Sequence, residues 1–262
     1  MKAGINVWTW GFDTKAAFEQ ALKEVSDIGY RYVENIYSVC EAFPDAAEFD
    51  ALLARYGVEF VCGYYHLSGD DEKDLARADV AVRFLAEHRA PVMNIQAAGR
   101  PQAGVTGQDL AHTAAMVKQV AVKARAAGVT PCLHPHYGTV VERAPELAYL
   151  MEHVEPTVLS LTLDTAHTVL GGMDPVATFA QYADRVGYVH MKDIGTVRDP
   201  DQPWYAGFRE LGRGAVDFPA IAAILKRAGF DGVLCVELDR PRICGYKSAL
   251  ISRQYLREEL GI

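Results

Sequence analysis

One unit is repeated along this chain: a short β-branched or apolar run, a segment of helical periodicity, and a glycine just before the next run. The segment 13–28 carries apolar residues at helical spacing, namely Ala17, Ala21, Leu22, Val25 and Ile28. Glycine occupies the same junction four times, as Gly29, Gly57, Gly128 and Gly229. Because glycine readily ends a helix, these junctions indicate successive βα units.

Eight candidate strands follow, and their spacing sets the fold class. They are residues 3–8, 30–35, 58–64, 91–96, 129–134, 158–164, 186–191 and 232–238. A strand, a helix and a parallel strand form a right-handed crossover. Eight such units predict a single (β/α)8 TIM barrel that takes in residues 1–262 as one domain. An open doubly wound sheet is the alternative, but no glycine-rich dinucleotide turn follows the first strand.

Composition limits the classes of binding partner that we expect. The formal net charge is −8 and the sequence pI is about 5.5, so nucleic acid and anionic membrane are not expected as partners. The five cysteines are odd in number and lack CxxC pairing, which argues against a disulfide framework. We find neither a signal peptide nor a stretch long enough to span a bilayer, and we expect a cytoplasmic protein.

Polar residues stand where seven of the eight predicted strands end. In a barrel these ends meet at one mouth, so their side chains should point toward a shared pocket. They are Glu34, His66, Gln96, His134, Asp164, His190 and Glu237. Any one could be a surface carboxylate or a satisfied histidine, but a buried set of this kind needs partners or a metal.

The longest irregular stretch, residues 195–214, follows the seventh predicted strand and should cover the mouth. It contains Arg209. We assign a substrate-binding role to Arg209, Glu34, His66, Gln96 and His167.

Six motifs give the second half of the chain a resemblance to a known family. They are HPHYGTVVE at 134–142, LDTAH at 163–167, GGMDP at 171–175, DRVGYVHMKD at 184–193, LGRGAVDF at 211–218 and VELD at 236–239. The pattern resembles the xylose-isomerase-like TIM-barrel superfamily of sugar isomerases, epimerases and AP endonucleases. Within it, the pattern is most similar to the inosose (2-keto-myo-inositol) dehydratases. The likeness covers residues 129–240 well and the N-terminal third only in architecture.

The resemblance implies a divalent ion held by two Glu, one Asp and one His. Asp164, His190 and Glu237 occupy matching motif positions. The strand-five ligand is open, because His134 stands where epimerases place a Glu. We favour Glu142, which a turn at 138–139 could fold back toward the metal. Alternatively, Glu142 caps the next helix, and His134 or His136 binds the ion.

An oxygen-rich set with one imidazole favours Mn²⁺ or Co²⁺, with Mg²⁺ or Zn²⁺ as the further options. Asp164 and His167 also resemble part of the endonuclease IV zinc site. That fold needs more histidine ligands and a basic DNA surface, which the acidic composition disfavours.

A chelated ketone would lose its α-proton to a side-chain base through a metal-stabilised enediolate, and a β-hydroxyl would leave as water. Lys192 either stabilises that charge, acts as the base, or simply pairs with Asp193. His134 or His136 could protonate the leaving hydroxyl, because imidazole exchanges protons near neutral pH. One of the two could instead be a packed supporting histidine.

The leading hypothesis is therefore a metal-dependent lyase that dehydrates a keto-inositol or related keto-sugar. A sugar isomerase or ketose 3-epimerase is the alternative if Glu142 and Glu237 act as acid and base on opposite faces of the substrate. An inactive sugar-binding barrel is the third possibility, disfavoured by the intact Asp164, His190 and Glu237. The tyrosine-rich segment 246–255 would permit a homo-oligomer without indicating one.

Overall fold

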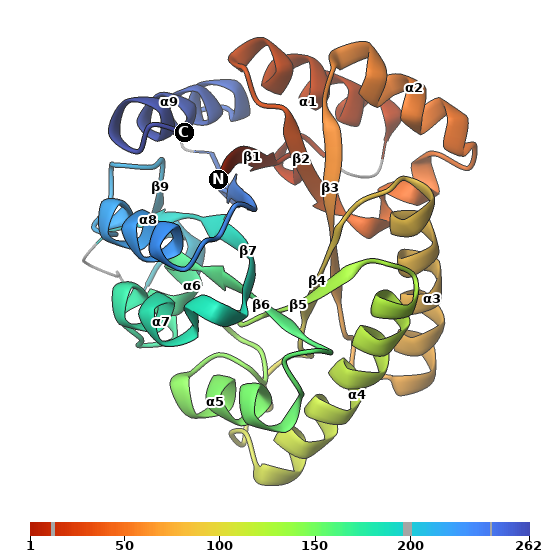
Figure 1. The fold of residues 1–262 in the computed structure, drawn as a ribbon, viewed down its shortest axis with the longest axis vertical. Coiled ribbons are helices and arrows are strands. Elements are labelled where there is room, and N and C mark those ends of the chain that lie inside the picture. The colour runs from red at the N-terminus through yellow and green to blue at the C-terminus, as the bar shows by residue number, and fades with distance from the viewer. Residues whose placement is uncertain (12–13, 196–200, 242) are drawn as a thin grey trace.

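Eight parallel strands close into a barrel in the computed structural model, which describes residues 1–11, 14–195, 201–241 and 243–262 (Figure 1). Around the barrel the order is β1, β10, β7, β6, β5, β4, β3 and β2. The strands are β1 Lys2–Asn6, β2 Tyr32–Ile36, β3 Glu59–His66, β4 Val92–Gln96, β5 Thr130–His134, β6 Ser160–Asp164, β7 Val186–Met191 and β10 Val233–Val236. The predicted TIM barrel is confirmed, with strand ends shifted by at most two residues.

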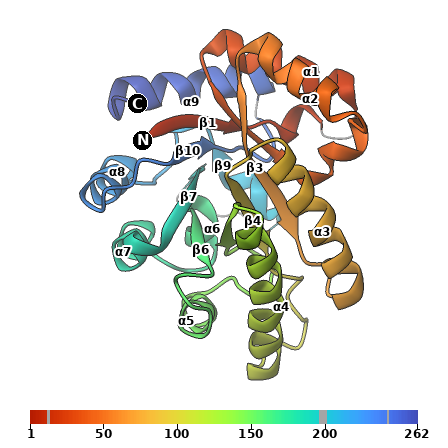
Figure 2. The same ribbon diagram turned by 45° about the vertical axis from the view of Figure 1, so that its right-hand side comes forward.

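Helices surround the barrel, and Figure 2 shows them outside the strands. They are α1 Lys15–Ile28, α2 Ala46–Tyr56, α3 Asp71–Glu87, α4 Gly107–Ala126, α5 Ala144–His153, α6 Thr165–Leu170, α7 Pro175–Tyr182, α8 Phe218–Arg227 and α9 Gly245–Glu259. The four predicted junction glycines all have positive φ, between 60° and 98°. In the described part of the chain, no helix is long and apolar enough to cross a membrane.

Part of the stretch predicted to be irregular forms a small sheet beside the barrel. After β7, β8 (Asp193–Ile194) pairs antiparallel with β9 (Phe208–Arg209), which follows the 3₁₀ turn Trp204–Gly207. The prediction for 195–214 is wrong at β9, because two residues are too short a strand to show a period. Residues 196–200 of that stretch lie outside the described residues.

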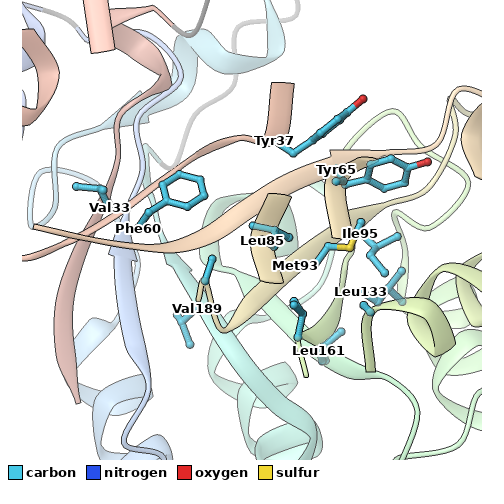
Figure 3. Close-up of a cluster of buried hydrophobic side chains, with 14 of the residues drawn as sticks. Val33, Tyr37, Phe60, Tyr65, Leu85, Met93, Ile95, Leu133, Leu161 and Val189 are labelled. Atoms are coloured by element: carbon cyan, nitrogen blue, oxygen red, sulfur yellow. The ribbon is translucent and has the colours of Figure 1, made fainter. Parts of the chain in front are cut away.

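The strands separate apolar from polar side chains with a period of two. Outward residues such as Met93, Leu133, Leu161 and Val189 pack toward the helices in one apolar cluster (Figure 3). Their neighbours along the strands face into the barrel. The polar or titratable side chains among them include Glu34, Asn94, Cys132, His134, Thr162, Asp164 and His190, each at most 1% exposed. Toward the carboxyl ends of the strands the interior thus holds polar groups, whereas Cys62, Tyr188 and Cys235 belong to a second buried apolar cluster.

Candidate metal centre and active site

The carboxyl ends of β6, β7 and β10 bring three predicted metal ligands together. Asp164 ends β6, His190 lies one residue before the end of β7, and Glu237 directly follows β10. His190 Nδ1 lies 2.8 Å from Glu237 Oε2 and 3.7 Å from Asp164 Oδ2. We call Asp164, His190 and Glu237 the strand-end cluster; its three side chains are at most 8% exposed.

Lys192 supplies positive charge to this cluster. Its Nζ lies 3.5 Å from Asp164 Oδ2, 3.1 Å from Glu237 Oε2 and 2.9 Å from Asp239 Oδ2. Burial disfavours the ammonium, but attraction to the three carboxylates outweighs burial and raises the pKa of Lys192. Lys192 therefore stays protonated near neutral pH. Of the two catalytic roles expected from the sequence, its contacts favour charge stabilisation over proton abstraction.

Two oxygens of the strand-end cluster are short of partners. Asp164 Oδ2 and Glu237 Oε2 are buried and make no hydrogen bond of good geometry, although cationic groups lie within 4 Å. Buried carboxylate oxygens are seldom left in this state. Together with the imidazole of His190 they form an oxygen-rich donor set, which fits a divalent cation.

His134, at the end of β5, lies beside this donor set. Its Nε2 is 3.2 Å from His190 Nδ1 and 3.7 Å from Asp164 Oδ2. One potential ligand atom from each of His134, Asp164 and His190 lies within 4.8 Å of the others. Burial, reinforced by the charge of His190, lowers the pKa of His134 although Asp164 acts in the opposite direction. A neutral imidazole is the form that binds metals.

Glu142, the strand-five ligand favoured from the sequence, is held elsewhere. Its carboxylate accepts a hydrogen bond from the Gly138 amide at 2.9 Å and lies 3.8 Å from Arg100 and 3.6 Å from Arg143. It lines a separate pocket near Gly172. The turn does fold Glu142 back, but toward Arg100, and the structure does not bring it into the strand-end cluster.

A cavity of about 220 Å³ opens above the strand-end cluster. Its lining residues are Asn6, Trp8, Ile36, Tyr64, Gln96, His136, Trp204, Glu237 and Asp239. The predicted residues Gln96, His136 and Glu237 line it. The indole rings of Trp8 and Trp204 form an apolar part of the cavity wall, and Glu237 belongs both to the cavity lining and to the candidate metal ligands.

His136 presents a defined acceptor to this cavity. Its Nδ1 lies 2.7 Å from the carbonyl oxygen of Tyr137, so Nδ1 carries the proton and Nε2 keeps a lone pair. Burial, aided by the nearby His134 and Lys192, lowers the pKa of His136 to about 3. His167 stacks on His136 with ring centroids 3.7 Å apart, but it is not among the residues that line the cavity.

Besides His167, three residues assigned to substrate binding lie outside this cavity. Glu34 is fully buried and contacts His190 from inside the barrel. His66 is exposed at the end of β3, where Tyr64, two residues earlier on the same face, lines the cavity instead. The Arg209 guanidinium donates to the carbonyl oxygens of Ala206 and Phe208.

Sequence reasoning missed Tyr64, Trp8 and Trp204 as cavity residues. Tyr64 shares the strand face of His66, so the period of two could have indicated it. The Tyr64 hydroxyl donates to Gln96 and lies 3.3 Å from His134 Nδ1. Trp8 and Trp204 lie in 3₁₀ turns beyond the strands, where no periodicity places a side chain.

The fold and the strand-end residues agree with a family match over residues 22–260, described as a xylose isomerase-like TIM barrel. The chain belongs to this family.

Curated relatives narrow the comparison. An inosose dehydratase of Lacticaseibacillus casei is 30% identical over 169 residues, which cover 60% of this chain and 57% of the relative. An inosose dehydratase of Geobacillus kaustophilus is 35% identical over 141 residues, covering 49% and 46%. The chain thus spans about half the length of the curated relatives it matches.

Solved structures share the fold at low sequence identity. The probable 3-DHS dehydratase AsbF of Bacillus anthracis has a TM-score of 0.82 at 16% identity and covers 98% of this chain and 99% of its own. The IOLI protein, solved with a bound zinc atom, has a TM-score of 0.81 at 17% identity, with coverage of 98% and 97%. An L-ribulose 3-epimerase has a TM-score of 0.80 at 20% identity, with coverage of 100% and 94%.

Proposed function

We propose that this chain is a divalent-metal-dependent hydro-lyase that removes water from a keto-inositol or a related keto-sugar. The observation that carries the proposal is the buried strand-end cluster, in which Asp164 Oδ2 and Glu237 Oε2 make no hydrogen bond of good geometry although the His190 imidazole lies within 4 Å of both. The likeness to inosose dehydratases supports the reaction class and the substrate.

Asp164, His190 and Glu237 would hold the metal, and His134 is the strand-five residue best placed to join them. Mn²⁺ or Co²⁺ suits the two carboxylates with one imidazole, and with His134 as a second imidazole the set suits Zn²⁺ as well. When bound, such an ion supplies Lewis acidity that polarises a substrate carbonyl and acidifies the neighbouring C–H bond.

His136 is proposed as the group that accepts the α-proton. Because burial, His134 and Lys192 lower its pKa to about 3, it is a weak base, and the transfer depends on the C–H acidity that a bound cation would supply. Its Nε2 lone pair is kept available by the Nδ1–H bond to Tyr137, and it faces the cavity. The electron pair of the broken C–H bond passes to the carbonyl oxygen. As it returns, the new C=C bond forms while the C–O bond of the β-hydroxyl breaks, and the hydroxide gains a proton and leaves as water.

Lys192 is proposed to assist the leaving hydroxyl. Its ammonium has three protons, and its neighbours in the structure are the carboxylates of Asp164, Glu237 and Asp239. If Asp164 and Glu237 serve a metal, Asp239 keeps the ammonium in place and two protons are freed for substrate oxygens. Lys192 then hydrogen-bonds to oxygen as negative charge develops there.

The epimerase alternative has less support. It requires two acid/base groups on opposite faces of the substrate, for which the sequence suggested Glu142 and Glu237. Glu142 is engaged by Gly138 and Arg100, away from the cavity that Glu237 lines.

The test is incubation of the Mn²⁺-loaded protein with 2-keto-myo-inositol and with free ketoses in D₂O. We expect the keto-inositol to lose water, and the absorbance of the diketone product measures this loss. Deuterium should enter the product at the reacting carbon. Asp164→Asn should reduce the rate by more than the roughly 10- to 100-fold that loss of an outer-shell partner costs.

The matched control is Asp174→Asn, because Asp174 caps α7 as Asp164 caps α6 and Asn caps helices as well as Asp. We expect its rate to equal that of the unchanged protein. Deuterium exchange of ketoses without water loss would replace the lyase by an epimerase. Neither signal from the metal-loaded protein would point to the inactive sugar-binding barrel.

A further inference from the structure

We infer that Glu34 is a positioning residue: it holds the His190 imidazole with Nε2 protonated, so that the Nδ1 lone pair is presented to the candidate metal position. This inference rests on the metal centre of the proposed function. It assigns Glu34 a task different from the substrate contact expected from the sequence.

The two ends of the His190 ring face different surroundings. Nδ1 faces the mouth side, where Glu237 Oε2 lies at 2.8 Å and His134 Nε2 at 3.2 Å. Nε2 faces Glu34 on β2, whose Oε2 lies at 2.8 Å. The side chains of His190 and Glu34 are both fully buried, so water does not compete for either group.

The neighbours of Glu34 fix its carboxylate. Asn94 Nδ2 donates to Glu34 Oε1 at 3.1 Å, and the Thr162 hydroxyl donates to the Asn94 amide oxygen. Because the amide oxygen of Asn94 is occupied by a donor, its NH₂ group is turned toward Glu34. The carboxylate therefore has one oxygen held by Asn94 and the other directed at His190.

With a cation at the mouth side, this arrangement selects the imidazole tautomer. Each ring nitrogen lies 2.8 Å from a carboxylate oxygen, Nε2 from Glu34 and Nδ1 from Glu237, and a nitrogen that carries a proton can donate to it. A cation held by Glu237 would take the place of the proton on Nδ1, whereas Glu34 keeps the proton on Nε2. The Asn94 NH₂ lies 3.1 Å from Nε2, but it is a donor and cannot accept that proton. Proton placement on Nε2 leaves Nδ1 as the nitrogen that can bind a cation. Carboxylates that orient histidine ligands in this way also raise ligand basicity.

The hydrogen-bond partners of the Glu34 carboxylate in the described part of the chain are Asn94 and His190. A buried carboxylate is costly unless it is paired, and here the imidazole of His190 and the amide of Asn94 pair with it. Removal of the whole carboxylate leaves these donors unpaired and destabilises the fold. We therefore expect Glu34→Gln, which keeps an acceptor for Nε2, to weaken metal binding more than it disturbs the fold.

The experiment measures Co²⁺ affinity by titration calorimetry for the unchanged protein, Glu34→Gln and Glu34→Ala. We expect a loss of about 10- to 100-fold for Glu34→Ala, as for other outer-shell partners. Glu34→Gln should lose less, because its amide oxygen can still accept the Nε2 proton without the negative charge. Glu34→Gln keeps the side-chain size and decides the outcome if Glu34→Ala does not fold.

Val189→Ala is the matched control. Val189 is also fully buried on β7, but it packs in the outer apolar cluster. The Val189→Ala substitution therefore lowers the stability of the fold without changing a contact of the imidazole. Its Co²⁺ affinity should equal that of the unchanged protein. A second readout is ¹⁵N NMR of His190 in the Zn²⁺-loaded protein, where we expect a protonated Nε2 and a metal-bound Nδ1.

Unchanged Co²⁺ affinity in both Glu34 variants, or an unprotonated Nε2, would overturn this inference while the metal centre stands. Failure of the unchanged protein to bind Co²⁺ would overturn the inference together with the proposed function.

Glu34, His190 and Cys235 also place ligand atoms within 4.8 Å of one another. A second bound ion with thiolate-to-Co²⁺ absorption would make Glu34 a ligand instead, and would likewise contradict the inference.

Discussion

Individual charges explain why the strand-end cluster can be buried. Lys192 is buried against Asp164, Glu237 and Asp239, and its pKa is raised by these carboxylates despite burial. From the sequence, this lysine could have been a base, an enolate stabiliser or an exposed partner of Asp193. Asp193 instead accepts backbone hydrogen bonds from Gly214 and Val216, so the surface pairing is not what the structure contains.

Lys192→Met is predicted to destabilise the metal-free protein by about 3 to 5 kcal/mol, because it leaves buried carboxylates without their counter-charge. Saturating Mn²⁺ should narrow this difference, since the cation would neutralise Asp164 and Glu237. The measurement is urea unfolding of both proteins with Mn²⁺ and with EDTA.

Lys118→Met is the control for loss of a lysine charge, because Lys118 forms an exposed pair with Glu155 on the surface. Its stability should change by less than about 1 kcal/mol in either condition. An equal destabilisation of Lys192→Met with and without Mn²⁺ would mean that no cation shares the charge of this cluster.

At the scale of elements, the loop from β5 to α5 is held by an ion pair that spans two βα units. The Glu146 carboxylate accepts hydrogen bonds from the amides of Glu142 and Arg143 and from the guanidinium of Arg100, which follows β4. Burial raises the pKa of Glu146, but these donors outweigh burial and the net pKa lies below 4.5. The loop that carries His136 is thereby tied to the rim of the barrel.

Glu146→Gln is predicted to cost about 2 kcal/mol of stability near neutral pH, in the range of hydrogen bonds to charged groups. Because the folded-state pKa is depressed, this contribution is complete above the unfolded-state pKa. It disappears as the pH falls through the folded-state value. Urea unfolding at several pH values between neutral and acid should show the two proteins converging in acid.

Glu152→Gln, an exposed change on the same helix, provides the comparison and should show no such pH dependence. A constant gap between Glu146→Gln and the unchanged protein from neutral to acid pH would show that the carboxylate charge is not what holds the loop.

The sequence predicted elements better than loops. The hydrophobic periodicity and the glycine junctions predicted the positions of all eight barrel strands, and the predicted range of β7 matches the structure without a shift. Glu142 was harder to place, because its partner Arg100 lies far away in sequence on another loop and no local pattern couples them. The β8–β9 pair and the tryptophans of the cavity depend on similar long-range contacts.

At the scale of the whole molecule, barrel closure joins residues from both ends of the chain. β1 pairs with β10, so Glu34 on β2 and Glu237 after β10 both reach His190. Parallel strands predict this convergence, because their carboxyl ends share one face. They do not predict depth, since the tilt of the strands sets how far each side chain sits below the mouth. Glu34 consequently lies beneath His190 rather than in the cavity.

The most direct test of the metal-dependent lyase is a titration of metal-stripped protein with Co²⁺, in which bound ion and water loss from 2-keto-myo-inositol are measured in the same samples. We predict that activity rises in proportion to bound Co²⁺ and levels off at about one ion per chain, as expected for one strand-end cluster. Full activity in the metal-stripped protein, or Co²⁺ binding that leaves Asp164→Asn as active as the unchanged protein, would contradict this account.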